Sequence, residues 1–352
     1  MKVLSRYVLS TLIKATLLIL LIFVGFEIFI LMATQLGSLG KGSYTIWQAI
    51  IYVILILPQQ TYLLFPVAGL LGMLFGFSWL ASHSELIIMR ASGVSPIQIL
   101  RYALQAGLIL VIFMVLIGEV IAPKAKLLAE KRKLTAISIG QVLKTQSGVW
   151  LRQGGNFYYI KTIYSARHIA DVSQYIFNQQ QLVSASFAKG GRYEHGGWQM
   201  FNIKQSHITD AAVTSTLMPH AIWHLAIDPH LLSISQRTPE EMSLHQLSDL
   251  INYQKSNHLI NNNERIVFWQ RIFQPLSILI MMFLAIPFVF GPLRTVTTSL
   301  RLVLGVIIGF AFYLSNQLFP PLSQVLDFPP LIAAILPPLV FALAGIILFR
   351  RI

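Results

Sequence analysis

The sequence predicts a polytopic α-helical membrane protein with six transmembrane helices and an all-β, jelly-roll-like domain inserted between helices three and four. The chain has 352 residues, of which 55% are hydrophobic and 11% charged, whereas about 25% of an average soluble domain is charged. Its apolar residues gather in six blocks, three on each side of a polar stretch from Lys124 to about Glu264. This composition excludes a disordered chain, a coiled coil and an ordinary cytosolic enzyme.

The three blocks before the polar stretch predict the first three spans, because a spanning helix needs roughly 20 apolar residues. They are approximately Leu12–Leu36, Ile46–Leu80 and Tyr102–Ala122. The second block is too long for one straight span and contains Pro58 and Pro66. It therefore forms either one long kinked helix or a short helix followed by a span. A proline frees the carbonyl four residues before it, and neighbouring groups must then satisfy that carbonyl.

Short apolar and aromatic segments, separated by turn residues, fill the polar stretch between about residues 148 and 235. This pattern is typical of an antiparallel sandwich or jelly roll, in which an open edge strand is available to a partner. Helical connectors are expected at Lys124–Lys133, which extends the third helix outward, and at Ser243–Asn257. The expected strands are Gly148–Arg152, Asn156–Ile163, Ile169–Asn178, Leu182–Ala188, Trp198–Gln205 and Leu217–Ile227, with Gly190-Gly191 and Gly196-Gly197 as turns.

Three further apolar blocks predict spans four to six, at about Ile266–Phe290, Leu300–Phe319 and Leu331–Phe349. The expected domains are residues 1–123 for helices one to three, with a short cytoplasmic helix at about 82–96, residues 124–264 for the β domain with its connectors, and residues 265–352 for helices four to six.

The basic residues of the short loops predict the orientation, because such residues stay on the cytoplasmic side. One face carries nine of them and the short loops of the other carry only Lys41. Both termini are therefore expected in the cytoplasm, and the β domain in the periplasm of a bacterium. The net charge of +13 reflects this topology and a basic cluster at Lys124–Lys133, and indicates no nucleic-acid partner. The nine are Lys2, Arg6, Lys14, Arg90, Arg101, Arg294, Arg301, Arg350 and Arg351.

Motifs for catalysis and nucleotide binding are missing from the sequence. It has no phosphate loop, no dinucleotide fingerprint, no H-E-x-x-H and no nucleophile elbow. It also has no cysteine, which excludes disulfides and thiolate metal sites. His220 and His224 lie in a strand-like run, where residues four apart are separated by about 13 Å, so no metal site is expected. We expect a non-enzymatic chain without a cofactor of its own; if the protein uses ATP, a separate chain must bind the ATP and Mg²⁺.

Two acidic residues lie in the predicted spans, where charged side chains are candidates for function. Glu27, near mid-depth, could line a water-filled cavity, pair with a partner or stay protonated. Glu119, near the outer interface, is better suited to pairing or snorkelling. Small residues four apart allow close helix packing, either within the chain or against a partner. Such pairs are Gly72-x-x-x-Gly76 and Gly305-x-x-x-Gly309.

The loop between spans two and three predicts a short amphipathic helix, capped by Ser82 or Ser84 and ended by Gly93 and Pro96. It is either a plain interfacial connector or a coupling helix that docks on a cytoplasmic motor. The residues expected to contact such a motor are Ser84, Glu85, Leu86, Met89, Arg90 and Gly93.

Several motifs resemble the LptF/LptG family of lipopolysaccharide export permeases, and its LptG branch in particular. The resemblance covers nearly the whole chain. Its motifs are Ser84-Glu85-Leu86, Ala91-Ser92-Gly93, Gly118-Glu119-x-x-Ala122-Pro123, Ala226-Ile227-Asp228-Pro229, Leu232-Ser233-Ile234-Ser235, Phe273-Gln274-Pro275-Leu276-Ser277, Met281-Met282 and Phe290-Gly291-Pro292-Leu293-Arg294.

This resemblance implies a heterodimer with an LptF-like permease, two copies of an LptB-like ATPase bound through coupling helices, and an LptC-like periplasmic bridge protein. The complex would sit in the bacterial inner membrane. Lipopolysaccharide would occupy a cavity lined by spans one and five and would leave it upward. An ion-coupled lipid transporter that uses Glu27 and a membrane-embedded enzyme on lipid or cell-wall substrates are the alternatives.

The resemblance also suggests a substrate path. Family members carry basic residues at the outer end of span one, where this chain keeps only Lys41 after Gly37, Ser38 and Gly40. Part of their role would pass to Lys131, Arg132 and Lys133 of the basic cluster, which is otherwise an anchor for lipid head groups. The residues assigned to the path are Glu27, Lys41, Lys131, Arg132, Lys133, Phe312, Tyr313, Asn316 and Gln317.

Overall fold

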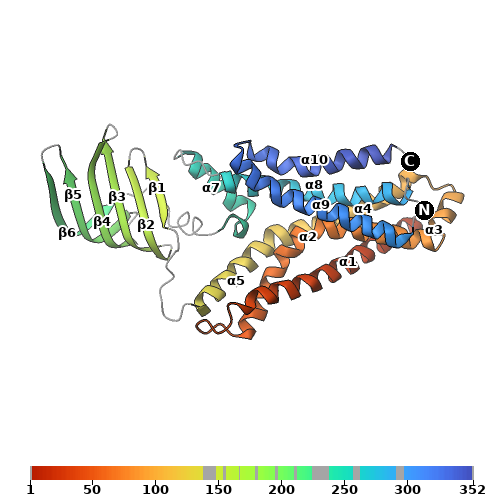
Figure 1. The fold of residues 1–352 in the computed structure, drawn as a ribbon, viewed down its shortest axis with the longest axis horizontal. Coiled ribbons are helices and arrows are strands. Elements are labelled where there is room, and N and C mark those ends of the chain that lie inside the picture. Colours follow the sequence, from red (N-terminus) through yellow and green to blue (C-terminus); the bar gives the residue numbers. More distant parts are fainter. Residues whose placement is uncertain are drawn as a thin grey trace. The chain divides into compact units, whose positions relative to one another are not determined.

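Among the residues that the computed structural model describes, six helices are long and apolar enough to cross a membrane, as the six apolar blocks predict (Figure 1). The described residues are 2–137, 148–153, 156–165, 167–178, 181–194, 197–209, 212–223, 238–256, 262–290 and 297–350. The described residues do not include Arg294, Arg351 or the motifs at 226–229 and 232–235. Two units can be distinguished: a helical unit (Met1–Leu39, Ile46–Glu130 and Asn262–Ile352) and a β unit (Gly40–Thr45 and Lys131–Asn261).

The helices of the first half follow the sequence blocks closely. They are α1 (Lys2–Leu36), α2 (Ile46–Ser82), the short α3 (Glu85–Ala91), α4 (Pro96–Leu116), a π-helical turn (Ile117–Ile121) and α5 (Ala122–Ile137). The π turn joins α4 and α5 without a break, so the third span continues to Ile137, and the predicted outward extension is confirmed. The helices of the second half are α8 (Asn262–Phe290), α9 (Thr298–Val325) and α10 (Pro330–Phe349).

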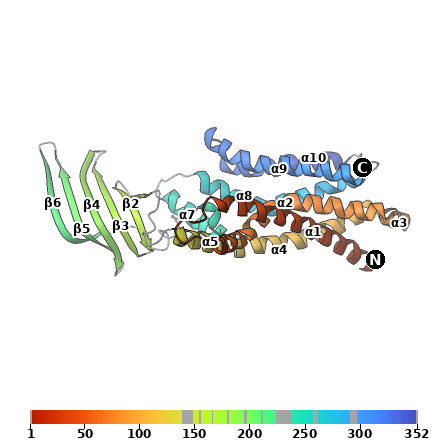
Figure 2. The same cartoon turned by 60° about the horizontal axis from the view of Figure 1, so that its bottom comes forward.

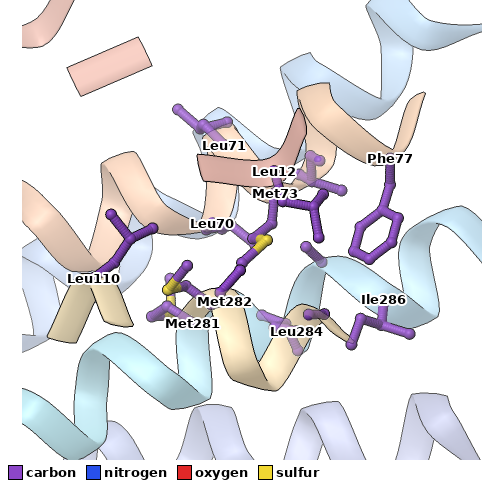
Figure 3. Packing of buried hydrophobic residues seen from close by; sticks show 14 of the residues in the cluster. Leu12, Leu70, Leu71, Met73, Phe77, Leu110, Met281, Met282, Leu284 and Ile286 are labelled. Atoms are coloured by element: carbon purple, nitrogen blue, oxygen red, sulfur yellow. The ribbon is translucent and has the colours of Figure 1, made fainter. Parts of the chain in front are cut away.

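The helical core lies mainly between α2 and α8. Helix α2 packs against α1, α8 and α9, while α8 also packs against α4, α9 and α10 (Figure 2). Leucine and methionine side chains from four helices meet there, because apolar side chains on facing helices interlock. Figure 3 shows this contact, formed by Leu12, Leu70, Leu71, Met73, Phe77, Leu110, Met281, Met282, Leu284 and Ile286.

Both small-residue pairs serve packing within the chain. A Cβ added to Gly72 would lie 2.4 Å from the Cα of Thr16 on α1. A Cβ added to Gly305 would lie 2.4 Å from the side chain of Leu74 on α2, and one on Gly309 would lie 2.6 Å from Val67. These positions therefore allow α1 and α9 to approach α2 closely.

Helix α2 is one long helix that runs through Pro58 and Pro66, so the first of the two alternatives for the second block holds. The carbonyl that Pro66 frees belongs to Tyr62, and it accepts a hydrogen bond of 3.1 Å from Nε2 of Gln274 on α8. Pro320 in α9 frees the carbonyl of Asn316, which accepts a hydrogen bond of 3.2 Å from Nε2 of Gln270. Two glutamines one turn apart on α8 thus satisfy proline-freed carbonyls in two neighbouring helices.

The start of α3 differs from the prediction. Ser84 occupies the N-cap position in the left-handed conformation (φ 60°) and its side chain makes no capping bond; the Ser82 hydroxyl donates back to the carbonyl of Trp79. The serine cap predicted for this helix is therefore wrong. The serine that caps a helix here is Ser95, which forms a capping box with Gln98 at the start of α4. Gly93 (φ 87°) ends α3 as expected.

The described strands of the β unit form one antiparallel sheet, confirming an all-β insertion between the third and fourth spans (Figure 1). In this part each strand pairs with its neighbour in sequence, which is meander order, whereas a jelly roll has crossed connections. Residues 224–237 lie outside the described part. The strands are β1 (Val149–Gln153), β2 (Asn156–Ser165), β3 (His168–Asn178), β4 (Gln181–Glu194), β5 (Gly197–Ile208) and β6 (Val213–Trp223).

Strand β4 is longer than predicted, because Gly190 and Gly191 lie inside it and not in a turn. Gly191 pairs with Ile169 on one side and with Met200 on the other. A Cβ at Gly191 would lie 2.5 Å from the sulfur of Met200, so a larger residue here would require the Met200 side chain to move. The glycine here is needed for close packing and not for a change of chain direction.

One face of the sheet is covered by apolar side chains, with Trp198 fully buried. Tyr253 on α7 (Leu244–Ser256), the predicted second connector, packs against this face. This burial raises the pKa of Tyr253 above its ordinary value. The buried side chains of this face are Tyr158, Ile160, Ile163, Ile169, Val172, Ala188, Trp198, Met200, Ile203 and Trp223.

Candidate functional site

Helix α3 presents a different surface from the one that its apolar residues suggest. Leu86 and Met89 are buried against the helical core. Ile87 and Ile88 are 67% and 61% exposed, and Arg90 is also exposed. Leu86 and Met89 therefore anchor α3 to its own chain, whereas Ile87, Ile88 and Arg90 are available to a partner. The residues predicted from the sequence to contact a motor include neither Ile87 nor Ile88, although two adjacent isoleucines on one short helix could have indicated them.

Glu85 is held by a residue far away in the sequence. The Tyr7 hydroxyl, near the start of α1, donates a hydrogen bond of 2.9 Å to Oε1 of Glu85. Within the described part of the chain, Oε2 of Glu85 is buried without a hydrogen-bond partner. The carboxylate thus links α3 to α1 through one of its two oxygens. No sequence signal connects Tyr7 with Glu85, since 78 positions separate them.

The loop at 40–45 is docked on the last turn of α5. Both the backbone N–H and the hydroxyl of Ser43 donate to the carbonyl of Ala136, at 2.8 and 3.0 Å. Gly42 has a φ of 61°, and a Cβ there would lie 2.5 Å from the carbonyl oxygens of Ala136 and Ile137. The docking therefore depends on glycine, and it brings the loop that carries Lys41 to the end of α5.

Lys41 and the basic residues of α5 belong to the same unit of the fold. Lys41, Lys131 and Arg132 are exposed, and Lys133 is half-buried. Successive helix residues point about 100° apart, so at most two of the three consecutive cations on α5 can face one anion. We call Lys41, Lys131, Arg132 and Lys133 the cationic cluster.

Helices α1 and α9 bury the smallest shares of their most apolar windows among the described spans, 22% and 17%, against 78% for α2. On α9, Phe310, Leu314 and Leu318 are exposed. On α1, Phe26 and Phe29 are exposed and Glu27 is half-buried. These are the two helices to which the family resemblance assigns the substrate.

The polar and aromatic residues predicted for the substrate path on α9 divide into two groups. Gln317 is exposed and donates a hydrogen bond of 3.3 Å to the hydroxyl of Tyr313, and Asn316 is half-buried. Phe312 is only 1% exposed and packs edge-on against Phe341 of α10, with ring centroids 5.2 Å apart. Its assignment to the path is therefore corrected: Phe312 belongs to the helix core, because its position on α9 faces α10.

Glu119 does pair, as its position near the interface suggested. Its carboxylate oxygen lies 3.6 Å from a guanidinium nitrogen of Arg271 on α8, and both side chains are largely buried. No group of three or more His, Asp or Glu residues that could hold a metal ion occurs among the described residues.

Comparison with known proteins shows which family this chain is similar to. A family model described as lipopolysaccharide export system permease LptF/LptG matches residues 6–351. The chain is 33% identical to the lipopolysaccharide export system permease protein LptG of Escherichia coli strain K12, over 99% of the chain and 98% of that protein. It is 32% identical to the LptG protein of Haemophilus influenzae, over 96% of the chain and 95% of that protein.

Proposed function

Because the chain belongs to the LptF/LptG family of lipopolysaccharide export permeases, we propose that it is the LptG-type transmembrane subunit of an ATP-driven exporter. The exporter extracts lipopolysaccharide from the bacterial inner membrane and passes it toward the outer membrane. The observation that carries this proposal is the family match over residues 6–351 in a chain with six candidate spans among its described residues.

The role of this chain in the exporter is mechanical. It makes and breaks no covalent bond, and ATP with Mg²⁺ is bound by a separate LptB-like ATPase, present in two copies. An LptF-like permease completes the membrane heterodimer, and an LptC-like protein receives the lipid. Both termini lie in the cytoplasm and the β unit in the periplasm, as the bias of basic residues in the short loops favours.

Helix α3 is the coupling helix in this proposal. The exposed Ile87 and Ile88 supply the apolar contact with the ATPase, and Arg90 a charged one. Glu85, fixed by Tyr7, takes a hydrogen bond or a cation from the ATPase. Because Leu86 and Met89 are packed in the helical core, movement of the docked motor is passed directly to the spans.

The substrate path combines apolar walls and a cationic rim. The exposed side chains of α1 and α9 suit acyl chains, and the cationic cluster suits the phosphates of lipid A through charge-assisted hydrogen bonds. Tyr313, Asn316 and Gln317 add polar positions along α9, and Glu27 adds one along α1.

Reconstitution tests this proposal. The chain is co-expressed with the LptF-like permease and the LptB-like ATPase, and the purified complex is placed in vesicles that contain lipopolysaccharide. We expect a stable complex that releases lipopolysaccharide to an LptC-like acceptor only when ATP is hydrolysed. Release that persists without the ATPase but requires a proton gradient would contradict the proposal and favour an ion-coupled transporter. Chemical turnover of a lipid by the chain alone would favour a membrane enzyme.

A further inference from the structure

The Glu119–Arg271 pair lies inside the helical unit, where an ion pair is unusual. One carboxylate oxygen of Glu119 is 3.6 Å from a guanidinium nitrogen of Arg271, and the side chains are only 18% and 12% exposed. A buried pair contributes little to stability, because both charges lose their hydration. Ionisable side chains at membrane depth are costly and are candidates for a functional role.

The backbone around Glu119 is irregular. Residues 117–121 form a π-helical turn between α4 and α5. Such turns are rare, and they occur frequently at functional positions of helices. Glu119 lies in the middle of this turn, so the ion pair joins the irregular point of the third span to α8.

A third helix, α2, contacts both the π turn and α8 at this place. The ring of Tyr62 on α2 packs flat on Gly118, where an added Cβ would lie 2.6 Å from the ring. The Tyr62 hydroxyl is buried beside both charges and has no hydrogen-bond partner among the described residues. The Tyr62 carbonyl accepts from Gln274, one turn after Arg271 on α8. Helices α2 and α8 and the π turn are thus tied together by polar contacts at one place.

The position of the ion pair matters because its two helical segments are those that lead into and out of the β unit along the chain. The β unit begins again at Lys131, within α5, and ends at Asn261, just before α8 begins. Apart from the loop at 40–45, the chain therefore enters the β unit through α5 and leaves it through α8. The Glu119–Arg271 pair joins these same two helical segments.

We propose that the Glu119–Arg271 pair is a positioning clasp of the export cycle, which holds the π turn and α8 together so that the two helices leading into and out of the β unit move as one. This inference rests on the proposed function. The clasp stays closed through the cycle, and without it ATP is hydrolysed but the movement reaches the β unit incompletely.

The test uses the complete complex in vesicles and two single variants, Glu119→Gln and Arg271→Gln. Each removes one charge and keeps most of the side-chain volume. We expect the lipopolysaccharide released per ATP to fall about tenfold, within the usual range of coupling between sites, while ATP hydrolysis stays near wild type. Thermal stability falls as well, because each single variant leaves one buried charge without its partner. A matched control is Arg192→Gln, which breaks the exposed Arg192–Glu194 pair on the sheet and should change nothing.

A crosslink provides the second arm. Because the chain has no cysteine, the double variant Glu119→Cys, Arg271→Cys can be bridged in place by a short bifunctional thiol reagent. The unbridged double variant should lose release per ATP, and bridging should restore it to within about threefold of wild type.

Each result decides the question. Single variants with the wild-type ratio of release to hydrolysis would overturn the clasp. A bridged variant that stays uncoupled would show that the pair must open, which also overturns it. A parallel fall of hydrolysis, release and thermal stability would assign the pair a purely structural role. A wild-type complex that releases no lipopolysaccharide contradicts the proposed function itself, and the clasp falls with it.

Discussion

The hydroxyl of Tyr7 on α1 donates a hydrogen bond of 2.9 Å to Glu85 on α3. This bond connects the first span, which exposes an apolar face, with the short helix proposed to dock on the ATPase. Because Leu86 and Met89 of α3 also pack into the helical core, α3 is attached to the spans by both polar and apolar contacts. The helix proposed to couple the ATPase to the spans is therefore fixed to the bundle by its own contacts.

The Tyr7–Glu85 bond predicts that two variants lose the coupling between ATP hydrolysis and lipid release to different degrees. Glu85→Lys reverses the charge at the motor contact and should uncouple ATP hydrolysis from lipid release. Tyr7→Phe removes only the hydrogen-bond donor and keeps the charge of Glu85, so it should have a smaller effect and lower release per ATP about fivefold. Both are measured in reconstituted vesicles, where the spans remain folded. Tyr164→Phe, an exposed tyrosine of the β unit, is the control. Normal release by Glu85→Lys would contradict the coupling role.

The cationic cluster predicts a charge-dependent contact with the substrate. Changing Lys131, Arg132 and Lys133 together to alanine should weaken crosslinking to lipopolysaccharide about fivefold, because at most two of them can face one anion and each exposed ionic contact is worth about 0.5 kcal/mol. Adding Lys41→Ala should weaken it further, and added salt should reduce the wild-type signal.

The matched control removes the same charge elsewhere in the β unit. Lys161, Lys189 and Lys204 are exposed on the sheet, and their joint replacement by alanine should leave crosslinking unchanged. Equal signals from both triple variants and the wild type would favour simple anchoring to lipid head groups.

The features that could be predicted correctly from the sequence are those that depend on the length of apolar runs and on the alternation of apolar and polar residues. The six spans, the extension of the third span and the positions of the strands all follow from these patterns. The turn predicted at Gly190 and Gly191 was wrong because glycine also permits close packing inside a strand, and only the neighbouring Met200 distinguishes the two uses.

The functional residues were harder to predict, because their roles depend on contacts between distant segments. The pairing of Glu119 followed from its depth in the span, but its partner Arg271 lies 152 positions away (119 to 271) and no local pattern marks it. Phe312 was misplaced because an aromatic residue on a half-exposed helix can face either way, and here Phe341 occupies the inner side. Ser84 lost its capping role because its backbone is left-handed.

The bond from Gln274 to the Tyr62 carbonyl predicts that the effects of Gln274→Ala and Pro66→Ala on the free energy of unfolding are not additive. Gln274→Ala should lower the free energy of unfolding by about 1–3 kcal/mol, because it leaves a buried carbonyl without its donor. In a Pro66→Ala background the cost should shrink, since alanine at position 66 restores a backbone N–H to the same carbonyl. Unfolding of the detergent-purified chain, analysed as a double-mutant cycle, measures the coupling.

Gln270→Ala provides the control for this cycle, because Gln270 serves the carbonyl freed by Pro320. Its cost should be the same with and without Pro66→Ala. If Gln274→Ala were equally costly in both backgrounds, the glutamine would act through packing and not through the freed carbonyl.

The close approach of α1 and α2 predicts opposite effects for two glycines in neighbouring helices. A Cβ at Gly72 would lie 2.4 Å from the backbone of Thr16, so Gly72→Ala must push the two helices apart and should destabilise the fold by about 1–3 kcal/mol. At Gly25 on α1, no described atom lies within 4 Å of the added Cβ, so Gly25→Ala should be neutral or slightly stabilising through helix propensity. Thermal unfolding of the purified chain in detergent measures both. Equal stabilities of the two variants would mean that α1 shifts along α2 without cost, and that Gly72 is not what sets their separation.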